Sequence, residues 1–148
     1  METRRFQSKD PSDKIAITDI IKEELALHNE SFDEKVWEDY LKKRDGDLQN
    51  RMGTILAVDD GTVAGFVLTE VRYEMTGKPF GYMHFPAVKR EYKTKVEEML
   101  CIEAIKYLKS IKGIKVIRSR LSPAQKLAIS VAMKLHFKQF ELEWQLLV

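Results

Sequence analysis

Basic side chains gather where a strand gives way to a helix, in the stretch VKREYKTKVEEML at residues 88–100. The four are Lys89, Arg90, Lys93 and Lys95. A helix N-terminus presents backbone N–H groups without intrahelical partners and the positive end of the helix dipole, and both attract anions. The stretch therefore predicts a site for a phosphate-bearing ligand, although charged residues at a helix start are equally typical of a solvated surface.

The same residues could also complete the helix start without a ligand. Thr94 is expected at the N-cap, and with Glu97 three residues later it forms a capping-box pattern that satisfies two backbone N–H groups. The carboxylates of Glu97 and Glu98 would lie near the positive helix end and repel an incoming anion. Both interpretations of the stretch stay open at this point.

His84, on the strand before this stretch, is a second candidate for chemistry. Imidazole titrates near neutral pH, which suits a general base. Glu70, on the neighbouring strand, could orient His84 or act as the base itself, and Tyr73 and Tyr82 are candidate acids. The alternative is that His84 and Glu70 are ordinary strand residues, one with a satisfied ring and the other with a solvated carboxylate.

The sequence gives little support for a metal site or for a nucleophilic cysteine. The single cysteine, Cys101, excludes an internal disulfide and lies among apolar helix residues, where a buried thiol is expected. The three histidines, His28, His84 and His136, lack the spacing of zinc ligands. No P-loop, Rossmann glycine run or nucleophile elbow occurs.

Length and composition indicate one soluble globular domain spanning residues 1–148. The net charge of +2, from 25 basic and 23 acidic residues, is too close to balance to indicate nucleic-acid binding. The first residues lack the apolar core of a signal peptide, and no apolar run approaches the roughly 18 residues of a membrane span. We therefore expect a cytoplasmic protein with neither a membrane nor a nucleic-acid partner.

Hydrophobic periodicity and turn residues predict the element order β-α-α-β-β-β-α-β-α-β. Strands are expected at 3–7, in a hairpin over 54–74, at 80–88, at 114–121 and after 137. Helices are expected from 11 to 28, from Ser31 to Asp45, from Thr94 to about 112, and from Ser122 onward. A right-handed βαβ unit would make the fourth and fifth main strands parallel.

This order and four phrases resemble the GNAT superfamily of N-acetyltransferases over nearly the whole chain. The phrases are RRFQSKD, TILAVDDGTVAGFVLTEV, AVKREYKTKVEEML and SPAQKLAISVAMKLHF. The resemblance implies an α/β (α+β) fold with a mixed, mostly antiparallel central sheet flanked by helices. It also implies acetyl-CoA as the acetyl donor and an amine of a small molecule or protein as the acceptor.

The resemblance further implies which residues would hold the cofactor. They are Ala87, Val88, Lys93, Thr94, Lys95, Val96, Glu97, Glu98 and Gln125. The pattern departs from the family at three places, because Val96 and Glu98 replace the loop glycines and Ala132 replaces a tyrosine taken as the general acid. Two functions stay open: an N-acetyltransferase with His84 and Glu70 as catalytic residues, and a non-catalytic binding or assembly module that could form a homodimer.

Overall fold

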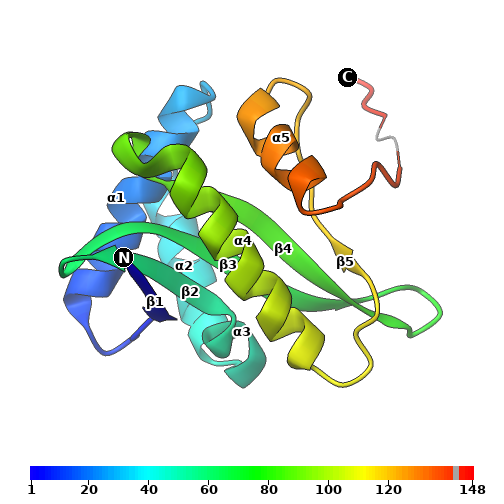
Figure 1. Cartoon of the computed structure of the whole chain (residues 1–148), viewed down its shortest axis with the longest axis horizontal. Helices are drawn as coiled ribbons and strands as arrows, with labels where there is room; N and C mark the ends of the chain where they lie inside the picture. The colour runs from blue at the N-terminus through cyan, green and yellow to red at the C-terminus, as the bar shows by residue number, and fades with distance from the viewer. Residues whose placement is uncertain (142–143) are drawn as a thin grey trace.

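The computed structural model describes residues 1–141 and 144–148, which fold around a five-stranded sheet in the order β1-β2-β3-β4-β5 (Figure 1). The strands are β1 (Glu2–Arg5), β2 (Thr54–Asp59), β3 (Thr62–Tyr73), β4 (Pro79–Val88) and β5 (Ile117–Arg118). The first four strands pair antiparallel, and β5 pairs parallel to β4. The predicted mixed, mostly antiparallel sheet flanked by helices is confirmed.

The helices follow the predicted order, with two additions, a short helix and a 3-10 turn. They are α1 (Pro11–Leu27), α2 (Glu34–Asp45), α3 (Leu48–Met52), the 3-10 turn η1 (Arg90–Tyr92), α4 (Lys93–Ser110) and α5 (Lys126–Lys134). Asp10 caps α1 as expected, whereas α2 is capped by Asp33 rather than by Ser31. The short α3 was not predicted, because five residues are too few to show a helical period. No helix within the described residues is long and apolar enough to cross a membrane.

The two faces of the sheet carry separate cores. Helix α4 covers one face and packs against residues such as Ile55, Val67 and Met83 (Figure 1). Helices α1 and α2 cover the other face, where Leu56 and Phe66 belong to the core. Because side chains alternate along a strand, each strand contributes to both cores.

Trp37 fixes α2 against α1. Its indole N–H donates to the Thr18 hydroxyl at 3.0 Å, and its ring stacks on Tyr40 with 5.9 Å between centroids. Trp37 is partly buried against the core of this face, and its bonded indole N–H leaves no unpaired donor there. This contact holds Tyr40 in place above the sheet.

Strand β5 is much shorter than the predicted 114–121. After Arg118 the chain leaves the sheet, and the Ser119 hydroxyl donates to the Met83 carbonyl at 2.6 Å. This side-chain bond satisfies a carbonyl that a backbone N–H of a longer strand would otherwise take. Strand β4 continues to Val88, so β4 and β5 separate beyond the Tyr82–Arg118 pair.

The predicted strand after residue 137 is wrong for the residues that the structure describes. Residues 138–141 and 144–148 form no strand, and Leu142, which belonged to the predicted alternation, lies outside the described residues. Phe140 contacts β5 through its ring, which lies 4.4 Å from the Arg118 guanidinium carbon. Trp144 is 88% exposed. The alternating pattern after residue 137 predicts a strand with one buried face. However, β5 has only two residues and so offers few backbone groups with which such a strand could pair.

The start of α5 also differs from the expectation, although its local pattern does form. Ser122 N–H donates to Gln125 Oε1 at 2.8 Å, and Ala124 N–H donates to Ser122 Oγ at 3.1 Å. These bonds close a turn, and the helix itself begins at Lys126. Gln125 is therefore engaged in local structure.

Replacing Gly53 by alanine is expected to lower the free energy of unfolding by about 2–3 kcal/mol, because an added methyl group overpacks a filled site. A Cβ atom at Gly53 would come within 1.9 Å of Thr69 Oγ1 and 3.0 Å of Tyr107 Cε1. Gly46→Ala is the matched control, because its Cβ would come no closer than 3.5 Å, to the Lys43 carbonyl. Urea unfolding of both variants measures the difference, and equal midpoints would contradict it.

Candidate active site

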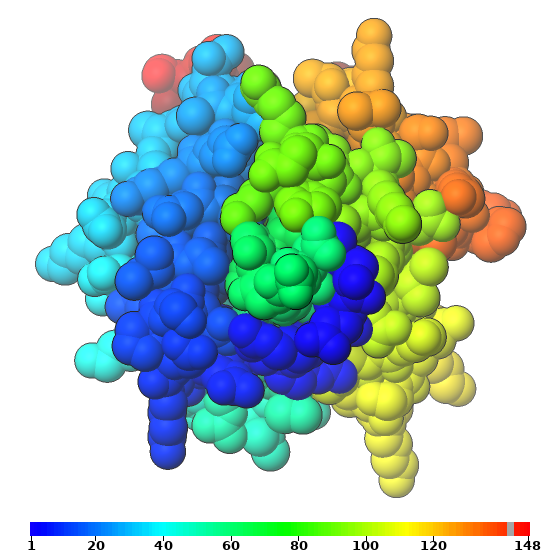
Figure 2. All heavy atoms as spheres, turned by 60° about the vertical axis from the view of Figure 1, so that its left-hand side comes forward, coloured from blue at the N-terminus to red at the C-terminus, as the bar shows by residue number. Residues whose placement is uncertain are grey.

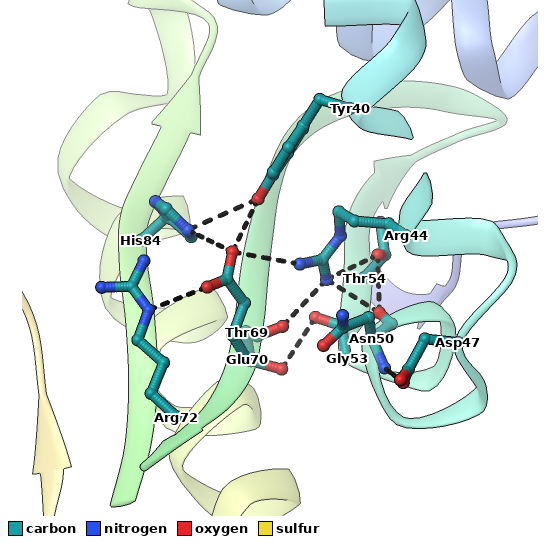
Figure 3. A network of polar contacts seen from close by, with 10 residues as sticks. All are labelled: Tyr40, Arg44, Asp47, Asn50, Gly53, Thr54, Thr69, Glu70, Arg72 and His84. Carbon is teal, nitrogen blue, oxygen red and sulfur yellow. Dashed lines mark hydrogen bonds and ion pairs between the residues drawn. The ribbon is translucent and has the colours of Figure 1, made fainter. Parts of the chain in front are cut away.

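Glu70 and His84, the two residues predicted to be catalytic, lie side by side on the α2 face of the sheet. The antiparallel register pairs Glu70 with Tyr82, which makes His84 a diagonal neighbour of Glu70. His84 Nε2 lies 2.9 Å from Glu70 Oε1 (Figure 3). The side chain of His84 is 38% exposed, so its ring can meet a ligand from solvent.

Two residues of α2 complete this group, and the sequence did not predict either of them. The Tyr40 hydroxyl donates to Glu70 Oε1 at 2.8 Å, and Arg44 Nη1 lies 3.7 Å from the same oxygen. Their spacing of four residues puts both side chains on one face of the helix. The four-residue spacing of a hydroxyl and a guanidinium group is the sequence signal that could have indicated them.

Arg44 holds this part of the structure together from the inside. Its side chain is 4% exposed. Nη2 donates to the Asn50 carbonyl at 2.8 Å, to Thr54 Oγ1 at 3.1 Å and to the Thr69 carbonyl at 2.9 Å (Figure 3). All three bonds fall on Nη2, whereas Nε and Nη1 are buried without a hydrogen-bond partner among the described residues, so the ion pair with Glu70 offsets the buried charge. The guanidinium group thus ties α2 to the α3 region and to two strands.

Arg72 occupies the second oxygen of the Glu70 carboxylate. Its Nε donates to Glu70 Oε2 at 2.9 Å, and its guanidinium carbon lies 3.5 Å from the centroid of the Tyr82 ring. The His84 ring meets the same Tyr82 ring edge-on, at 5.0 Å. Tyr82, a candidate acid from the sequence, therefore supports both Arg72 and His84.

The protonation states of the group follow from these contacts. The hydrogen bond from His84, with further bonds from Tyr40 and Arg72, holds the pKa of the Glu70 carboxyl well below its usual range, although burial opposes this. Burial raises the pKa of Tyr40 to about 12. Glu70 is therefore an anion and Tyr40 a neutral donor near neutral pH.

His84 is left with one open nitrogen. An ionised Glu70 favours the tautomer that carries its proton on Nε2 and donates it to Oε1. Among the residues that the structure describes, Nδ1 has no hydrogen-bond partner. The pair can therefore accept a proton at Nδ1 while the carboxylate stabilises the resulting imidazolium.

The separation of β4 from β5 begins one residue before His84. From there to Val88, no described strand pairs with the outer edge of β4. A bulge lies in the same segment, because Phe66 pairs with Ala87 while Leu68 pairs with His84. The free edge could pair with an extended ligand, as sheet edges do in peptide recognition.

The start of α4 differs from the prediction for Thr94. The 3-10 turn η1 precedes the helix, which begins at Lys93, so Thr94 already lies inside the first turn. The N-cap residue Tyr92 makes no side-chain capping bond to any described residue. The predicted capping box of Thr94 and Glu97 is wrong, and the first N–H groups of α4 lack a side-chain cap.

The start of α4 is instead fixed by contacts to two other elements. The Tyr92 hydroxyl donates to Asp59 Oδ2 at 3.0 Å, and Lys93 Nζ lies 3.2 Å from Glu24 Oε2. Figure 2 shows this end of the molecule, with the β2–β3 turn between α1, in blue, and the start of α4, in yellow-green. Lys93, a predicted cofactor residue, is therefore paired within the protein.

Glu97 points into the protein interior rather than toward the helix end. It is 4% exposed, and its Oε2 atom is buried without a hydrogen-bond partner among the described residues. Burial raises the pKa of Glu97 to about 7, with Lys93 opposing the increase and Glu24 adding to it. Glu97 is therefore a half-protonated buried acid near neutral pH.

The remaining predicted cofactor residues divide between core and surface. Ala87, Val88 and Val96 are buried, so their side chains belong to the cores of the sheet. Glu98 pairs with Lys134 of α5 at 2.9 Å. An open groove runs along α4 and is lined by Lys95, Glu98, Met99, Ile102 and Glu103.

Two further expectations concern helix residues. Cys101 is fully buried as predicted, and burial raises the pKa of its thiol to about 12, which excludes it as a thiolate nucleophile. Ala132, at the position of the family tyrosine, lies in α5 and is also buried. An alanine cannot donate a proton, so another group must serve any step that needs an acid.

Solved structures with the same architecture include several acetyltransferases. An aminoglycoside acetyltransferase from an uncultured soil metagenomic sample, in complex with sisomicin, has a TM-score of 0.76 and 13% identity, covering 99% of this chain and 95% of that chain. Glucosamine-6-phosphate N-acetyltransferase from Arabidopsis thaliana has a TM-score of 0.69 and 12% identity, covering 99% and 97%. An aminoglycoside N-acetyltransferase in complex with CoA has a TM-score of 0.56 and 19% identity, covering 64% and 65%.

At these identities the structural likeness concerns the fold alone. No curated protein sequence matches the chain significantly. The model of the acetyltransferase (GNAT) family, however, matches residues 16–137, which include the strand of His84, the start of α4 and the whole of α5. The chain therefore belongs to the GNAT family of acetyltransferases.

Proposed function

We propose that this protein transfers an acetyl group from acetyl-CoA to an amine of a small molecule or a protein, with His84 as general base and Glu70 as its orienting partner. The observation that carries the proposal is the 2.9 Å contact between Glu70 and His84, placed where β4 separates from β5. A hydrogen-bonded carboxylate and imidazole at an open sheet edge can remove a proton from a bound amine.

When bound, acetyl-CoA would supply the acetyl thioester: a C–N bond forms as the C–S bond breaks, and the leaving thiolate takes a proton from water. His84 accepts the proton that the amine loses, at Nδ1, and Glu70 stabilises the imidazolium through Nε2. Tyr40 and Arg72 hold the Glu70 carboxylate, so the ring keeps its orientation during the transfer.

The start of α4 fits a phosphate group in one respect. Because no side chain caps the helix within the described residues, no capping side chain competes with an anion for the first backbone N–H groups of α4. The side chains of Lys89, Arg90 and Lys95 could add charge at the same place. Val96 stands at one of the family's glycine positions, but its side chain is buried in the core. It therefore does not cover the helix surface that a phosphate would approach.

Thermal unfolding with and without acetyl-CoA tests the proposal. Ligand at about 100 times its dissociation constant adds about 2.7 kcal/mol to stability. For a domain of 148 residues that corresponds to a rise in Tm of roughly 5–10 °C. Release of CoA thiol in the presence of an amine panel is the second readout. The proposal would be refuted if millimolar acetyl-CoA left Tm unchanged and no thiol were released with any amine of the panel.

A non-catalytic binding module is the second candidate function, and the residues around the start of α4 favour it. Glu97 adds a buried carboxyl group to the first turn, with a pKa of about 7. Lys93 and Glu98, at two of the predicted cofactor positions, are already paired with Glu24 and Lys134. This candidate predicts no effect of acetyl-CoA on Tm, which separates it from the first.

A further inference from the structure

The guanidinium group of Arg72 presents donors that the protein itself does not use. Only Nε is bonded, to Glu70 Oε2 at 2.9 Å, while the two terminal nitrogens point away from the carboxylate (Figure 3). No described residue accepts from them. The side chain is 42% exposed, and its guanidinium carbon lies 3.5 Å from the centroid of the Tyr82 ring. The fork is thus held rigidly and faces solvent.

The charge around this fork is positive. Two guanidinium groups, from Arg44 and Arg72, flank the single carboxylate of Glu70. That carboxylate already accepts from Tyr40, His84 and Arg72, so it has little capacity left for the ammonium group of a substrate. Like charges in such a site oppose the binding of a polycation.

A neighbouring acid does not change this balance. Glu74, the next carboxylate along the chain, is bonded to Arg118 at 2.8 Å. The guanidinium group of Arg118 in turn lies 4.4 Å from the ring of Phe80. Arg118 therefore uses a terminal nitrogen for Glu74, whereas Arg72 bonds Glu70 through Nε.

We propose that the acceptor is a small amine that also carries an oxyanion, a carboxylate or a phosphate, which binds the terminal nitrogens of Arg72. The inference rests on the proposed function, because it places the amine of this substrate at His84. Arg72 and His84 bind the two oxygens of the Glu70 carboxylate, and both contact the Tyr82 ring. Because the two side chains lie this close together, only a few bonds of the substrate would separate its amine from its oxyanion. A planar fork recognises an oxyanion through two parallel hydrogen bonds.

Thiol release with matched amines tests the acceptor class. Each pair of amines differs only in the oxyanion. Glucosamine 6-phosphate and glucosamine differ in the phosphate, and β-alanine and its methyl ester differ in the carboxylate charge. We expect kcat/KM to be about tenfold or more higher for the anionic member of one pair, as charge-assisted bonds would give. The pair that shows the preference identifies the oxyanion. Equal rates within both pairs, or a higher rate with sisomicin, would overturn the inference.

The Arg72→Gln variant tests whether Arg72 binds the oxyanion. The readout is the ratio of kcat/KM for the anionic amine to kcat/KM for its matched partner. We expect the preference for the anionic amine to fall to about one, while Arg118→Gln, the matched control, keeps it. If Arg72 only positions Glu70, both members of the pair slow equally and the ratio stays unchanged, which would count against the proposal.

Binding without acetyl-CoA separates this inference from the proposed function. N-acetylglucosamine 6-phosphate is titrated into the full chain while the ring signals of His84 are followed by NMR. Shifts that N-acetylglucosamine does not cause, and that Arg72→Gln abolishes, support the anion site even if no thiol is released. If neither N-acetylglucosamine 6-phosphate nor N-acetyl-β-alanine shifts the His84 signals in this way, the anion site is overturned, whether or not the protein is an enzyme.

Discussion

Replacing Glu97 by glutamine is expected to raise the free energy of unfolding by about 3 kcal/mol at pH 8 and by less than about 1 kcal/mol at pH 5. In the folded chain the pKa of Glu97 is about 7, against an ordinary value of 4.5, because burial disfavours the carboxylate. Each unit of difference corresponds to about 1.4 kcal/mol. Glutamine keeps the shape of the neutral acid and never acquires the charge.

The sign of the pH dependence follows from proton binding. Between pH 4.5 and 7 the folded protein holds a proton on Glu97 that the unfolded chain has released. The contribution of this group to stability is therefore largest below pH 4.5 and declines as pH rises to 7. Glu70 acts in the opposite direction, because its lowered pKa stabilises the fold above pH 4.5 and this stabilisation is lost in acid.

Urea unfolding at pH 5 and pH 8 measures the effect, with Glu98→Gln as the matched control. Glu98 carries the same chemical change one residue along α4, but it is partly exposed and loses only its pair with Lys134. Its substitution is expected to alter stability by less than about 1 kcal/mol at either pH. A gain for Glu97→Gln that is equal at both pH values would show that ionisation of this acid does not limit stability.

His84→Gln is expected to lower kcat for acetyl transfer by about 10²–10⁴, the usual contribution of a general base. The glutamine amide can still donate to Glu70, so the local hydrogen bond is kept while the basic nitrogen is lost. His28→Gln, which alters an exposed histidine bonded to Glu24, is the matched control.

Glu70→Gln separates orientation from proton transfer. The variant should slow the reaction and also destabilise the fold, because the buried Arg44 would lose its nearest carboxylate. The difference in unfolding free energy between the Glu70→Gln variant and the unaltered protein at pH 7 measures this destabilisation. If His84→Gln retained full activity with a panel of amines, His84 would not be the base and the role of Glu70 would fall with it.

The sheet could be predicted because its signals are local. Asp60-Gly61 and Gly77 mark the two hairpin turns, and both glycines adopt positive φ. Once these turns are placed, the antiparallel register brings Glu70 beside His84. The pair could therefore be predicted from sequence as neighbours on adjacent strands.

The other site residues could not be placed in this way, because they come from a separate element. Tyr40 and Arg44 reach Glu70 across 30 and 26 positions of the chain, and only the packing of α2 on the sheet joins them. The capping box failed for a related reason. Thr94 and Glu97 have the right spacing, but the 3-10 turn before Lys93 moved the helix start and directed Glu97 inward.

The stacking of Trp37 on Tyr40 gives this protein an optical reporter of its own site. Tyr40 bonds the same carboxylate as His84, so a ligand that displaces it also changes the surroundings of the indole. The second tryptophan, Trp144, is exposed, and iodide would quench its emission selectively. Fluorescence recorded in iodide would then follow occupancy of the site without an added dye, a coupled assay or a label.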